Sequence, residues 1–454
     1  MAGCTAESGN MPAFYPKDRY HSVFAGPPPP ALPDRLMDIR FQRAVDKYAG
    51  VPLCALFTAW DWGLRKLGLR RKRQGAPQRI LVILLSEMGS LVLAEPMFQA
   101  IRTRYPEAEL HVMLFAKNRE VMDLLGVVPP KNVITLNDAD LKEFASDLWE
   151  AFQKMRALRF DVVIDCELFA RVSSLIGYLS GAPVLVGFEP HTQEGLYRGG
   201  YLTNPVMYNP YRHLSYQLLT MVDAIDSTTH PAGKCLPPDE PITPPTLVFN
   251  EGEVESEATR LESDFPTIAG KPLVLIYPSG GILPIRAWPL ENYYRVADHF
   301  LQQGYAVGVI GLKGDKAFGQ SVLNHCRNPM CIDLTGYTRS VRHLLALFHR
   351  AALLITNDGG PGQFAAMTPI PTLILFGPET PRLYRSWAKN AYFFHQPLAC
   401  SPCLTAYNHR MSPCDGDNQC LKQITPDQVL TKAHELLGLP PAAQAISFTL
   451  QPNQ

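Results

Sequence analysis

One polar, glycine-rich turn in the carboxyl-terminal half of the chain has the residue types of a phosphate site. It follows the apolar run 353–355, and its candidate ligand contacts are Thr356, Asn357, Asp358, Gly359, Gly360 and Gln363. Glycines let a backbone approach a ligand, and the N–H groups of the helix expected to start near Pro361 attract anions. We expect Asp358 to orient backbone amides or a sugar hydroxyl. The alternative is an aspartate that only caps the helix.

A second polar turn follows the apolar run 272–277. Ser279 and Gly280 open it, and Arg286 lies farther along among glycines and prolines. The planar guanidinium of arginine suits a diphosphate because it offers parallel N–H donors to neighbouring oxygens. Arg286 is therefore a candidate phosphate ligand, and the alternative is a surface arginine packed on Trp288.

A third turn, residues 86–96, follows the first apolar run of the predicted folded region. Its two carboxylates, Glu87 and Glu95, are the only acids there that could act as a general base. Such a base must deprotonate a hydroxyl so that it can attack. The alternative for each is an ordinary surface glutamate.

Apolar runs and helical segments alternate along most of the chain, which predicts the elements that hold these turns. We expect strands at 79–85, 110–115, 133–136, 160–165, 272–277, 305–310, 352–356 and 371–376. We expect helices at 93–105, 118–125, 140–158, 290–303 and 341–351. This alternation is typical of doubly wound sheets, where ligands bind beyond the carboxyl ends of the strands. The predicted fold class is α/β and GT-B-like, with two Rossmann-like domains of doubly wound parallel sheet facing a central cleft.

Length and charge also favour two domains. The 454 residues exceed the ~250–300 of a single hydrophobic core. The 42 basic and 42 acidic residues balance, so no strong field attracts nucleic acid. We predict five parts: a proline-rich, poorly ordered lead-in (1–34), a helical and basic extension (35–77), two Rossmann-like domains (78–240 and 241–435, the second with a cysteine-rich loop at 400–420), and a tail (436–454).

The extension at 35–77 joins an apolar segment to a basic one. Trp60 and Trp62 end the apolar part, and the cations behind it are Arg65, Lys66, Arg70, Arg71, Lys72 and Arg73. The apolar part is shorter than the ~20 residues that span a bilayer. Such a helix lies on an anionic membrane surface or packs on the first domain, and the sequence leaves both open. The amino-terminal residues lack the pattern of a secretory signal, so we expect a cytoplasmic protein. If the helix lies on a membrane, the protein is expected to be peripheral on the inner face of the cytoplasmic membrane.

Four of the ten cysteines cluster in one loop: Cys400, Cys403, Cys414 and Cys420. In a reducing compartment their spacing indicates tetrahedral thiolate coordination of a structural zinc ion. Four protein ligands leave no open position, so we expect no catalytic role for such a metal and no cofactor for catalysis. The alternative is four uncoordinated or redox-labile thiols, and His395 and His409 are substitute ligands.

The order of these motifs resembles glycosyltransferase family 9, the heptosyltransferases of lipopolysaccharide core assembly. The resemblance runs from about residue 80 to residue 429 and includes 160–165, Ser173, Ser174, 186–188, 333–336 and 375–378. It implies an inverting enzyme that transfers a sugar, typically heptose from an ADP-linked donor, to a lipid-linked saccharide or another envelope glycan at the inner leaflet.

The same resemblance assigns roles to the three turns. Asp358, Gly359 and Gly360 correspond to the donor-binding turn, and Arg286 stands where the family has a cation for the donor phosphates. The matching residues of the acceptor loop, in the amino-terminal domain, are Ser86, Met88 and Gly89.

Two departures from the family pattern concern the chemistry itself. Ser90 stands where the family has its catalytic aspartate, and a serine hydroxyl accepts no proton at neutral pH without activation. Glu87 or Glu95 then serves as base, or the acceptor differs, or the enzyme is slow or inactive; Glu95 is favoured because it lies one helical turn beyond Ser90. Gln363 replaces the usual histidine and Gly359 the usual serine or threonine, which leaves the donor open.

The leading hypothesis is a glycosyltransferase that works by direct displacement. The substitution at Ser90 favours the alternative, a catalytically impaired homologue that binds a nucleotide-sugar or a glycan. A sugar-nucleotide epimerase of the same fold is the third hypothesis, and the motif set argues against it.

Overall fold

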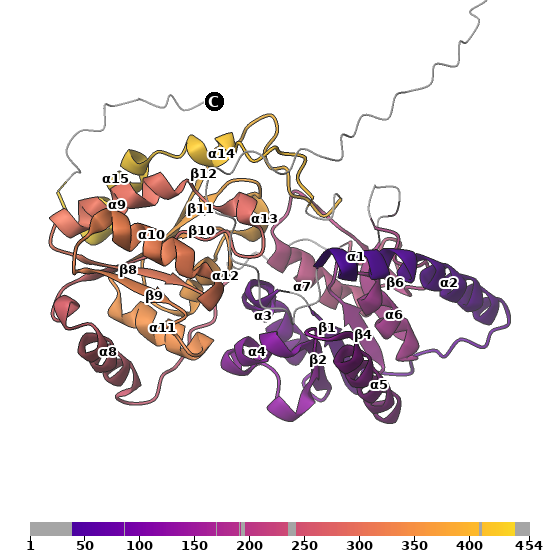
Figure 1. Cartoon of the computed structure of the whole chain (residues 1–454). Helices are drawn as coiled ribbons and strands as arrows, with labels where there is room; N and C mark the ends of the chain where they lie inside the picture. The colour runs from indigo at the N-terminus through magenta and orange to yellow at the C-terminus, as the bar shows by residue number, and fades with distance from the viewer. Residues whose placement is uncertain are drawn as a thin grey trace, which may run out of the picture.

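Two lobes, each built on a six-stranded parallel sheet, make up the folded chain (Figure 1). The computed structural model describes residues 39–85, 87–168, 170–189, 191, 196–234, 242–407 and 411–440. The central strands are continuous apolar runs because helices cover both faces of such sheets. The predicted α/β class with two doubly wound sheets is confirmed, while the domain boundaries stay predictions.

The first sheet has the order β3-β2-β1-β4-β5-β6. Its strands are β1 (Arg79–Ile83), β2 (Glu109–Phe115), β3 (Val133–Leu136), β4 (Val162–Asp165), β5 (Val184–Glu189) and β6 (Asn204–Met207). The helices of this lobe are α3 (Met88–Arg104), η1 (Ala116–Asn118), α4 (Arg119–Leu125), η2 (Pro130–Asn132), α5 (Leu141–Leu158), α6 (Arg171–Leu179) and α7 (Leu214–Ala224). The order reverses between β1 and β4, so the carboxyl ends of these two strands border a binding crevice.

The second sheet has the order β12-β11-β10-β7-β8-β9. Its strands are β7 (Leu273–Tyr277), β8 (Ala306–Gly311), β9 (Cys331–Thr335), β10 (Leu353–Asn357), β11 (Thr372–Phe376) and β12 (Ala391–His395). The helices are α8 (Glu253–Asp264), η3 (Pro266–Ile268), η4 (Pro284–Arg286), α9 (Leu290–Gln302), η5 (Lys313–Asp315), α10 (Lys316–Cys326), α11 (Val341–Arg350), α12 (Gly360–Phe364), η6 (Ala365–Met367), α13 (Pro381–Tyr384), α14 (Gln419–Lys422) and α15 (Pro426–Leu437). Here the order reverses between β7 and β10, the two strands that precede the predicted phosphate turns.

Two helices precede the first sheet, α1 (Ile39–Tyr48) and α2 (Gly50–Lys66). Helix α3 starts at Met88, five residues before its predicted start, so Met88, Gly89 and Ser90 form its first turn instead of a loop. Glycine and serine there resemble loop residues, but they also fit the first turn of a helix, where N–H groups lack helical partners. In the described ranges, no helix has the length and apolarity needed to cross a membrane.

The lobes contact each other along a seam in which α3 packs on α12 and α4 packs on α11. Ser215 of α7 lies at the centre of one contact. Its hydroxyl donates to the backbone oxygen of Leu93 at 2.7 Å and accepts from the indole N–H of Trp387 at 3.0 Å. The seam therefore places the first turn of α3 beside the donor-side turn of the second lobe.

His213 should make the seam sensitive to acid. Its ring lies 4.3 Å from that of Trp387, and its Nε2 lies 2.9 Å from the backbone oxygen of Arg385. Burial lowers the pKa of His213 to about 4, against the opposing effect of the Arg385 hydrogen bond. Because the folded pKa is depressed, the stability that neutral His213 contributes is present above pH 6.5 and is lost as the pH falls through the folded value.

We expect wild type to lose about 2 kcal/mol of unfolding free energy relative to His213→Asn between about pH 7.5 and about pH 5, since one pKa unit corresponds to about 1.4 kcal/mol. Denaturant unfolding of both proteins at the two pH values measures this difference. If the difference in unfolding free energy between wild type and His213→Asn is the same at both pH values, His213 does not titrate in this way.

Candidate functional site

Asn357, at the end of β10, ties together the two turns predicted to bind phosphate. Its Oδ1 accepts from the backbone N–H of Trp288 and from the hydroxyl of Tyr293, both at 3.0 Å. Its Nδ2 donates to the backbone oxygens of Ser279 at 3.0 Å and Tyr277 at 3.3 Å. These hydrogen bonds are all internal, so the Asn357 side chain positions the loop that carries Arg286.

The loop after β7 is tightly folded. Ser279 donates from Oγ to Asp315 at 2.6 Å and accepts from the N–H of Gly281 at 3.0 Å. At Gly280, a Cβ atom would lie 2.6 Å from the backbone oxygen of Leu283, which leaves room only for glycine. Ser279 and Gly280 therefore shape the loop around Arg286.

Arg286 lies in the interior and not on the surface. Its side chain is 14% exposed, and Trp288, the packing partner in the surface alternative, is itself buried. The guanidinium Nη2 lies 2.8 Å from Oε1 of Glu379, and Nε lies 3.9 Å from Oδ2 of Asp358. One arginine thus faces two buried carboxyl groups.

The electrostatics of this cluster are unusual for two acids. Burial raises the pKa of Asp358, although the Arg286 charge acts to lower it. Burial also raises the pKa of Glu379 to about 8; Arg286 lowers this value and Asp358 raises it. Two carboxylates in a site of low dielectric are not both ionised at neutral pH when one cation neutralises them. Burial and the proximity of the second carboxyl group therefore favour retention of a proton by this pair.

Glu379 was not predicted from the sequence. The matched segment 375–378 ends one residue before it, and it enters the site from the loop after β11. Its position at the carboxyl end of a strand was the available signal.

The helix predicted to start near Pro361 is present after the Asp358 turn, but it is short. Helix α12 has only five residues, with Gly359 before it and Pro361 in its first turn, and η6 follows. So short a helix has a weak dipole, and Arg286 becomes the main source of positive charge. Thr356 is buried at the sheet end, where its Oγ1 donates to the backbone oxygen of Asn357 at 2.9 Å. A phosphate bound here would therefore depend on the Arg286 side chain more than on a helix end.

Gln363 joins the donor-side turn to the first lobe. Its Nε2 donates to the backbone oxygen of Tyr384 at 2.6 Å, and its buried Oε1 has no hydrogen-bond partner among the described residues. A Cβ atom on Gly89 would lie 3.1 Å from Cγ of Gln363. The structure thus brings Gly89 of the predicted acceptor loop against the predicted donor turn.

The carboxylate beside Ser90 is that of Glu87. Ser90 Oγ donates to Glu87 Oε2 at 3.3 Å, whereas Glu95 is buried and accepts from Gln99 of its own helix at 2.9 Å. The structure therefore favours Glu87 over Glu95 as the acid at this position. Met88 packs against the core of the lobe. Ser86 lies outside the described residues.

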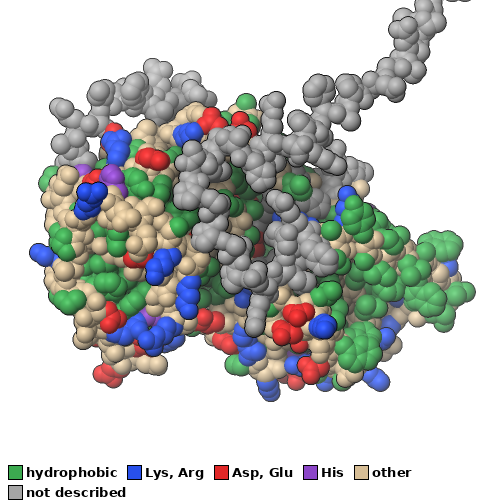
Figure 2. Space-filling view, in the orientation of Figure 1, with side chains coloured by type: hydrophobic (Ala, Val, Ile, Leu, Met, Phe, Trp, Pro, Cys, Tyr) green, Lys and Arg blue, Asp and Glu red, His purple; other side chains and the backbone are tan. Residues whose placement is uncertain are grey.

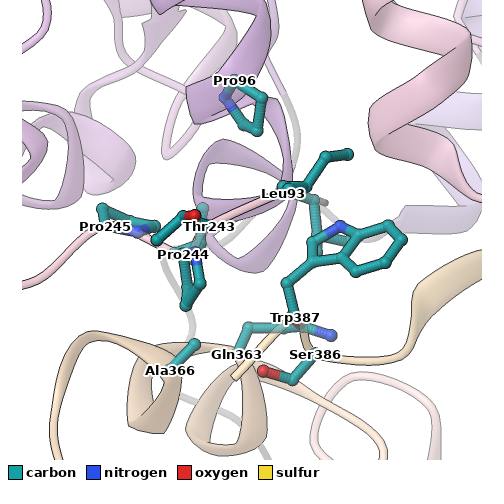
Figure 3. A pocket seen from close by; sticks show the side chains of 11 residues that line it. Leu93, Pro96, Thr243, Pro244, Pro245, Gln363, Ala366, Ser386 and Trp387 are labelled. Atoms are coloured by element: carbon teal, nitrogen blue, oxygen red, sulfur yellow. The ribbon is translucent and has the colours of Figure 1, made fainter. Parts of the chain in front are cut away.

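A small cavity lies between Gln363 and helix α3 (Figure 3). Residues of α3, of the linker between the lobes, of α12 with η6 and of the segment after α13 line it, among them Pro96, Thr243, Pro244, Gln363, Ala366 and Trp387. Its lining contains no charged side chain, so the cavity is not suited to a phosphate.

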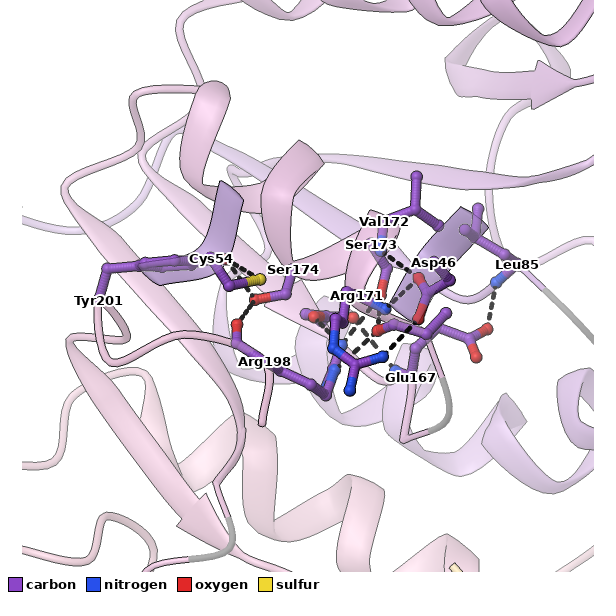
Figure 4. Close-up of polar contacts among 12 residues, drawn as sticks. Asp46, Cys54, Leu85, Glu167, Arg171, Val172, Ser173, Ser174, Arg198 and Tyr201 are labelled. Atoms are coloured by element: carbon purple, nitrogen blue, oxygen red, sulfur yellow. Dashed lines mark hydrogen bonds and ion pairs between the residues drawn. The ribbon is translucent and has the colours of Figure 1, made fainter. Parts of the chain in front are cut away.

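Glu167 is a further carboxylate that the sequence did not single out. It follows β4, and its Oε1 accepts from the backbone N–H of Leu85 at 2.7 Å, at the root of the acceptor loop (Figure 4). Asp165, two residues earlier, forms a buried ion pair with Arg198. Glu167 therefore anchors the start of the loop that carries Glu87.

The helices α1 and α2 of the extension pack on the first lobe through polar contacts (Figure 4). Packing on the first domain was one of the two alternatives predicted for this extension. Asp46 of α1 accepts from the backbone N–H of Arg171 at 2.7 Å and from its guanidinium at 2.9 Å, at the start of α6. Cys54 of α2 lies 3.5 Å from the hydroxyl of Tyr201. One side of the helical pair is thus fixed, although its tryptophans remain exposed.

The structure places the four clustered cysteines in the segment that follows β12. Among the residues that the structure describes, no group of three or more His, Cys, Asp or Glu side chains is placed to hold a metal ion. Cys400 is exposed, Cys420 is buried, and Cys403 accepts a hydrogen bond from Ser412 at 3.1 Å. His409 lies outside the described residues. Zinc binding stays a prediction.

Known proteins match the chain along most of its length. The model of glycosyltransferase family 9 (heptosyltransferase) matches residues 148–412. Lipopolysaccharide heptosyltransferase 2 of Salmonella typhimurium is 26% identical over 79% of this chain and 99% of its own length. The protein of that name from Escherichia coli is 24% identical over 79% and 98%.

Solved structures share the fold. E. coli ADP-heptose lps heptosyltransferase II has a TM-score of 0.61 at 21% identity, covering 79% of this chain and 98% of that chain. An E. coli heptosyltransferase solved with ADP has a TM-score of 0.55 at 15% identity, covering 79% and 99%. Two Rossmann-like lobes, the ordered motifs and these matches agree: the chain belongs to glycosyltransferase family 9 and is a glycosyltransferase.

Proposed function

We propose that the protein is an inverting transferase that moves heptose or a related sugar from a nucleotide-linked donor to a lipid-linked saccharide or another envelope glycan. One observation carries the proposal. The largely buried side chain of Arg286 lies beside Asp358 at the carboxyl ends of β7 and β10, and the same Asp358 turn reaches Gly89 of the first lobe through Gln363. The ADP in a solved relative of the same fold supports an ADP-linked donor.

In the proposed reaction, the oxygen of the acceptor hydroxyl attacks the anomeric carbon while the bond from that carbon to the diphosphate oxygen breaks. The hydroxyl proton goes to Glu87, which Ser90 orients. The electron pair of the broken bond leaves with the nucleoside diphosphate, and Arg286 stabilises its charge. A single displacement inverts the anomeric centre and needs no covalent intermediate.

A thermal-shift screen of ADP-, GDP-, UDP- and dTDP-sugars tests the donor. A ligand that binds the native state raises the unfolding midpoint by mass action. We expect ADP-sugars to give the largest shift, and donor consumption to require an acceptor. Binding without any transfer would indicate the impaired homologue, and donor conversion without acceptor would indicate an epimerase.

We also propose that α2 holds the enzyme on the anionic cytoplasmic face of the membrane. Trp60 and Trp62 are 63% and 64% exposed, and Leu56, Leu67 and Leu69 are exposed near them. Figure 2 shows hydrophobic side chains gathered at the outer end of the first lobe, where Figure 1 places α2. Tryptophans beside cations suit the headgroup layer.

The cations near α2 are not equally available to lipid. Arg65 and Arg70 pair with the buried Asp61, at 2.6 Å and 2.5 Å, and Arg73 pairs with Asp226 at 2.5 Å. Lys66 and Lys72 are exposed. Apolar insertion therefore contributes more to the proposed membrane contact than charge does.

Replacing Trp60 and Trp62 together by alanine should weaken binding to vesicles of phosphatidylglycerol and phosphatidylethanolamine by about 30-fold or more, because about 2 kcal/mol of apolar burial is lost. Vesicle co-sedimentation measures the effect. Trp149→Ala is the matched control, because Trp149 of α5 is 63% exposed elsewhere on the lobe. Equal loss in both variants would contradict docking through α2.

A further inference from the structure

Glu379 has a place in the donor site that the proposed chemistry does not yet explain. It lies between β11 and α13, it is 2% exposed, and its Oε1 is 2.8 Å from Nη2 of Arg286. Its carboxyl group also hydrogen bonds with that of Asp358. Glu379 thus contacts Arg286, which is proposed to bind the donor diphosphate, and Asp358 of the donor turn.

The charges in this cluster conflict with the binding of an anion. Two ionised carboxylates and one guanidinium would leave a net negative charge in a buried site, and a diphosphate would add two more. The other titratable groups that face the cluster are phenols: Tyr277, Tyr384 and Tyr208. Burial raises the pKa of each phenol, so none of them supplies or removes charge near neutral pH.

The guanidinium of Arg286 does not use all of its hydrogen-bond donors within the described residues. Nε of Arg286 and Oδ2 of Asp358 are buried, and neither has a hydrogen-bond partner among the described residues. They lie 3.9 Å apart, beyond hydrogen-bond distance. Buried polar atoms without partners are rare in folded proteins, and an unpaired arginine N–H can donate a hydrogen bond to an anionic ligand.

We propose that Glu379 is a positioning residue of the donor site, which acts as a neutral acid: it donates a hydrogen bond to Asp358 and leaves the positive charge of Arg286 to the diphosphate of a nucleotide-sugar. This inference rests on the proposed function. Its consequence is that an ionised Glu379 competes with the diphosphate for Arg286. Donor affinity should therefore fall as the pH rises and Glu379 loses its proton.

Calorimetric titration of the full chain with ADP-glucose tests this coupling, since the charge of that diphosphate ester stays constant between neutral and alkaline pH. From about pH 7 to about pH 9.5 we expect wild-type affinity to fall at least about 10-fold. Glu379→Gln, which keeps the amide N–H as a donor to Asp358, should vary less than about twofold and bind more tightly than wild type at the higher pH. Glu251→Gln, at an exposed carboxylate before α8, is the control. Parallel pH profiles of wild type and Glu379→Gln would overturn the proposal.

A second measurement needs no ligand. The folded pKa of Glu379 lies above its unfolded value, so the stability that its neutral form contributes is lost as the pH rises. The unfolding midpoint of Glu379→Gln should therefore rise relative to wild type between about pH 5 and about pH 9. A constant difference overturns the proposal even if ADP-glucose does not bind. If the difference in unfolding midpoint grows with pH but ADP-glucose does not bind, the proposed donor is contradicted. The protonation of Glu379 is then still supported.

Discussion

Replacing Arg286 by alanine should lower nucleotide-sugar affinity by at least about 100-fold, because about 3 kcal/mol of charge-assisted hydrogen bonding to the diphosphate is lost. Arg286 is the cation that the structure places at the carboxyl ends of β7 and β10, and α12 is too short to replace it. Turnover should fall further than affinity, since the charge on the leaving diphosphate grows in the transition state. Calorimetric titration and a donor-consumption assay measure the two effects.

The same substitution should reduce stability less than the loss of an ordinary buried cation. Removing one partner of a buried ion pair costs about 3–5 kcal/mol. Asp358 and Glu379 already share a proton, and a second proton would neutralise both. Arg295→Ala is the control, because Arg295 pairs with Asp427 on the surface and its side chain is 59% exposed. An Arg286→Ala protein that is folded and binds donor normally would contradict the phosphate site.

Replacing Glu87 by glutamine should lower turnover by about 100-fold to 10,000-fold, the usual contribution of a general base, with donor affinity unchanged. The reason is geometric. Glu87 lies beside Ser90, in the first turn of α3 that meets Gln363, and the substitution leaves the charge at Arg286 untouched. Single-turnover transfer with a saturating donor separates the chemical step from binding.

Glu95→Gln is the matched control for Glu87→Gln, since Glu95 lies on the same helix and accepts from Gln99. It should keep most of the activity. Ser90→Asp, added to Glu87→Gln, should restore turnover because it places a carboxylate at the family position. If Glu95→Gln alone abolishes transfer, the original preference for Glu95 from the sequence is right and Glu87 is not the base.

The sequence predicted the central strands of both sheets because they are buried on both faces, but it did not predict the strands β5, β6, β9 and β12. Strands such as β7 and β10 are continuous apolar runs that end in polar turns, so strand and turn appear together in the sequence. The start of α3 was harder to place, because Gly89 and Ser90 fit a loop and a first helical turn equally well. Parallel sheets thus gave the position of Arg286 and Asp358 but not the local shape around them.

The acids of the site were predicted less well because their environment comes from distant parts of the chain. Glu379 lies far from Arg286 in sequence, and only the folded sheet brings them together. Glu95 and Glu87 look alike as residues, and their hydrogen-bond partners distinguish them. The same holds for Asn357, whose internal contacts come from Ser279, Trp288 and Tyr293.

Hydrogen exchange with and without a bound nucleotide-sugar tests the central claim most directly. We expect slower exchange of the backbone amides at 279–286 and 358–363 in the presence of the ADP-, GDP-, UDP- or dTDP-sugar that raises the unfolding midpoint most. Exchange in α8 and α15, on the outer side of the second lobe, should stay unchanged. Protection confined to other segments, with both turns unaffected, would contradict a donor site at Arg286 and Asp358.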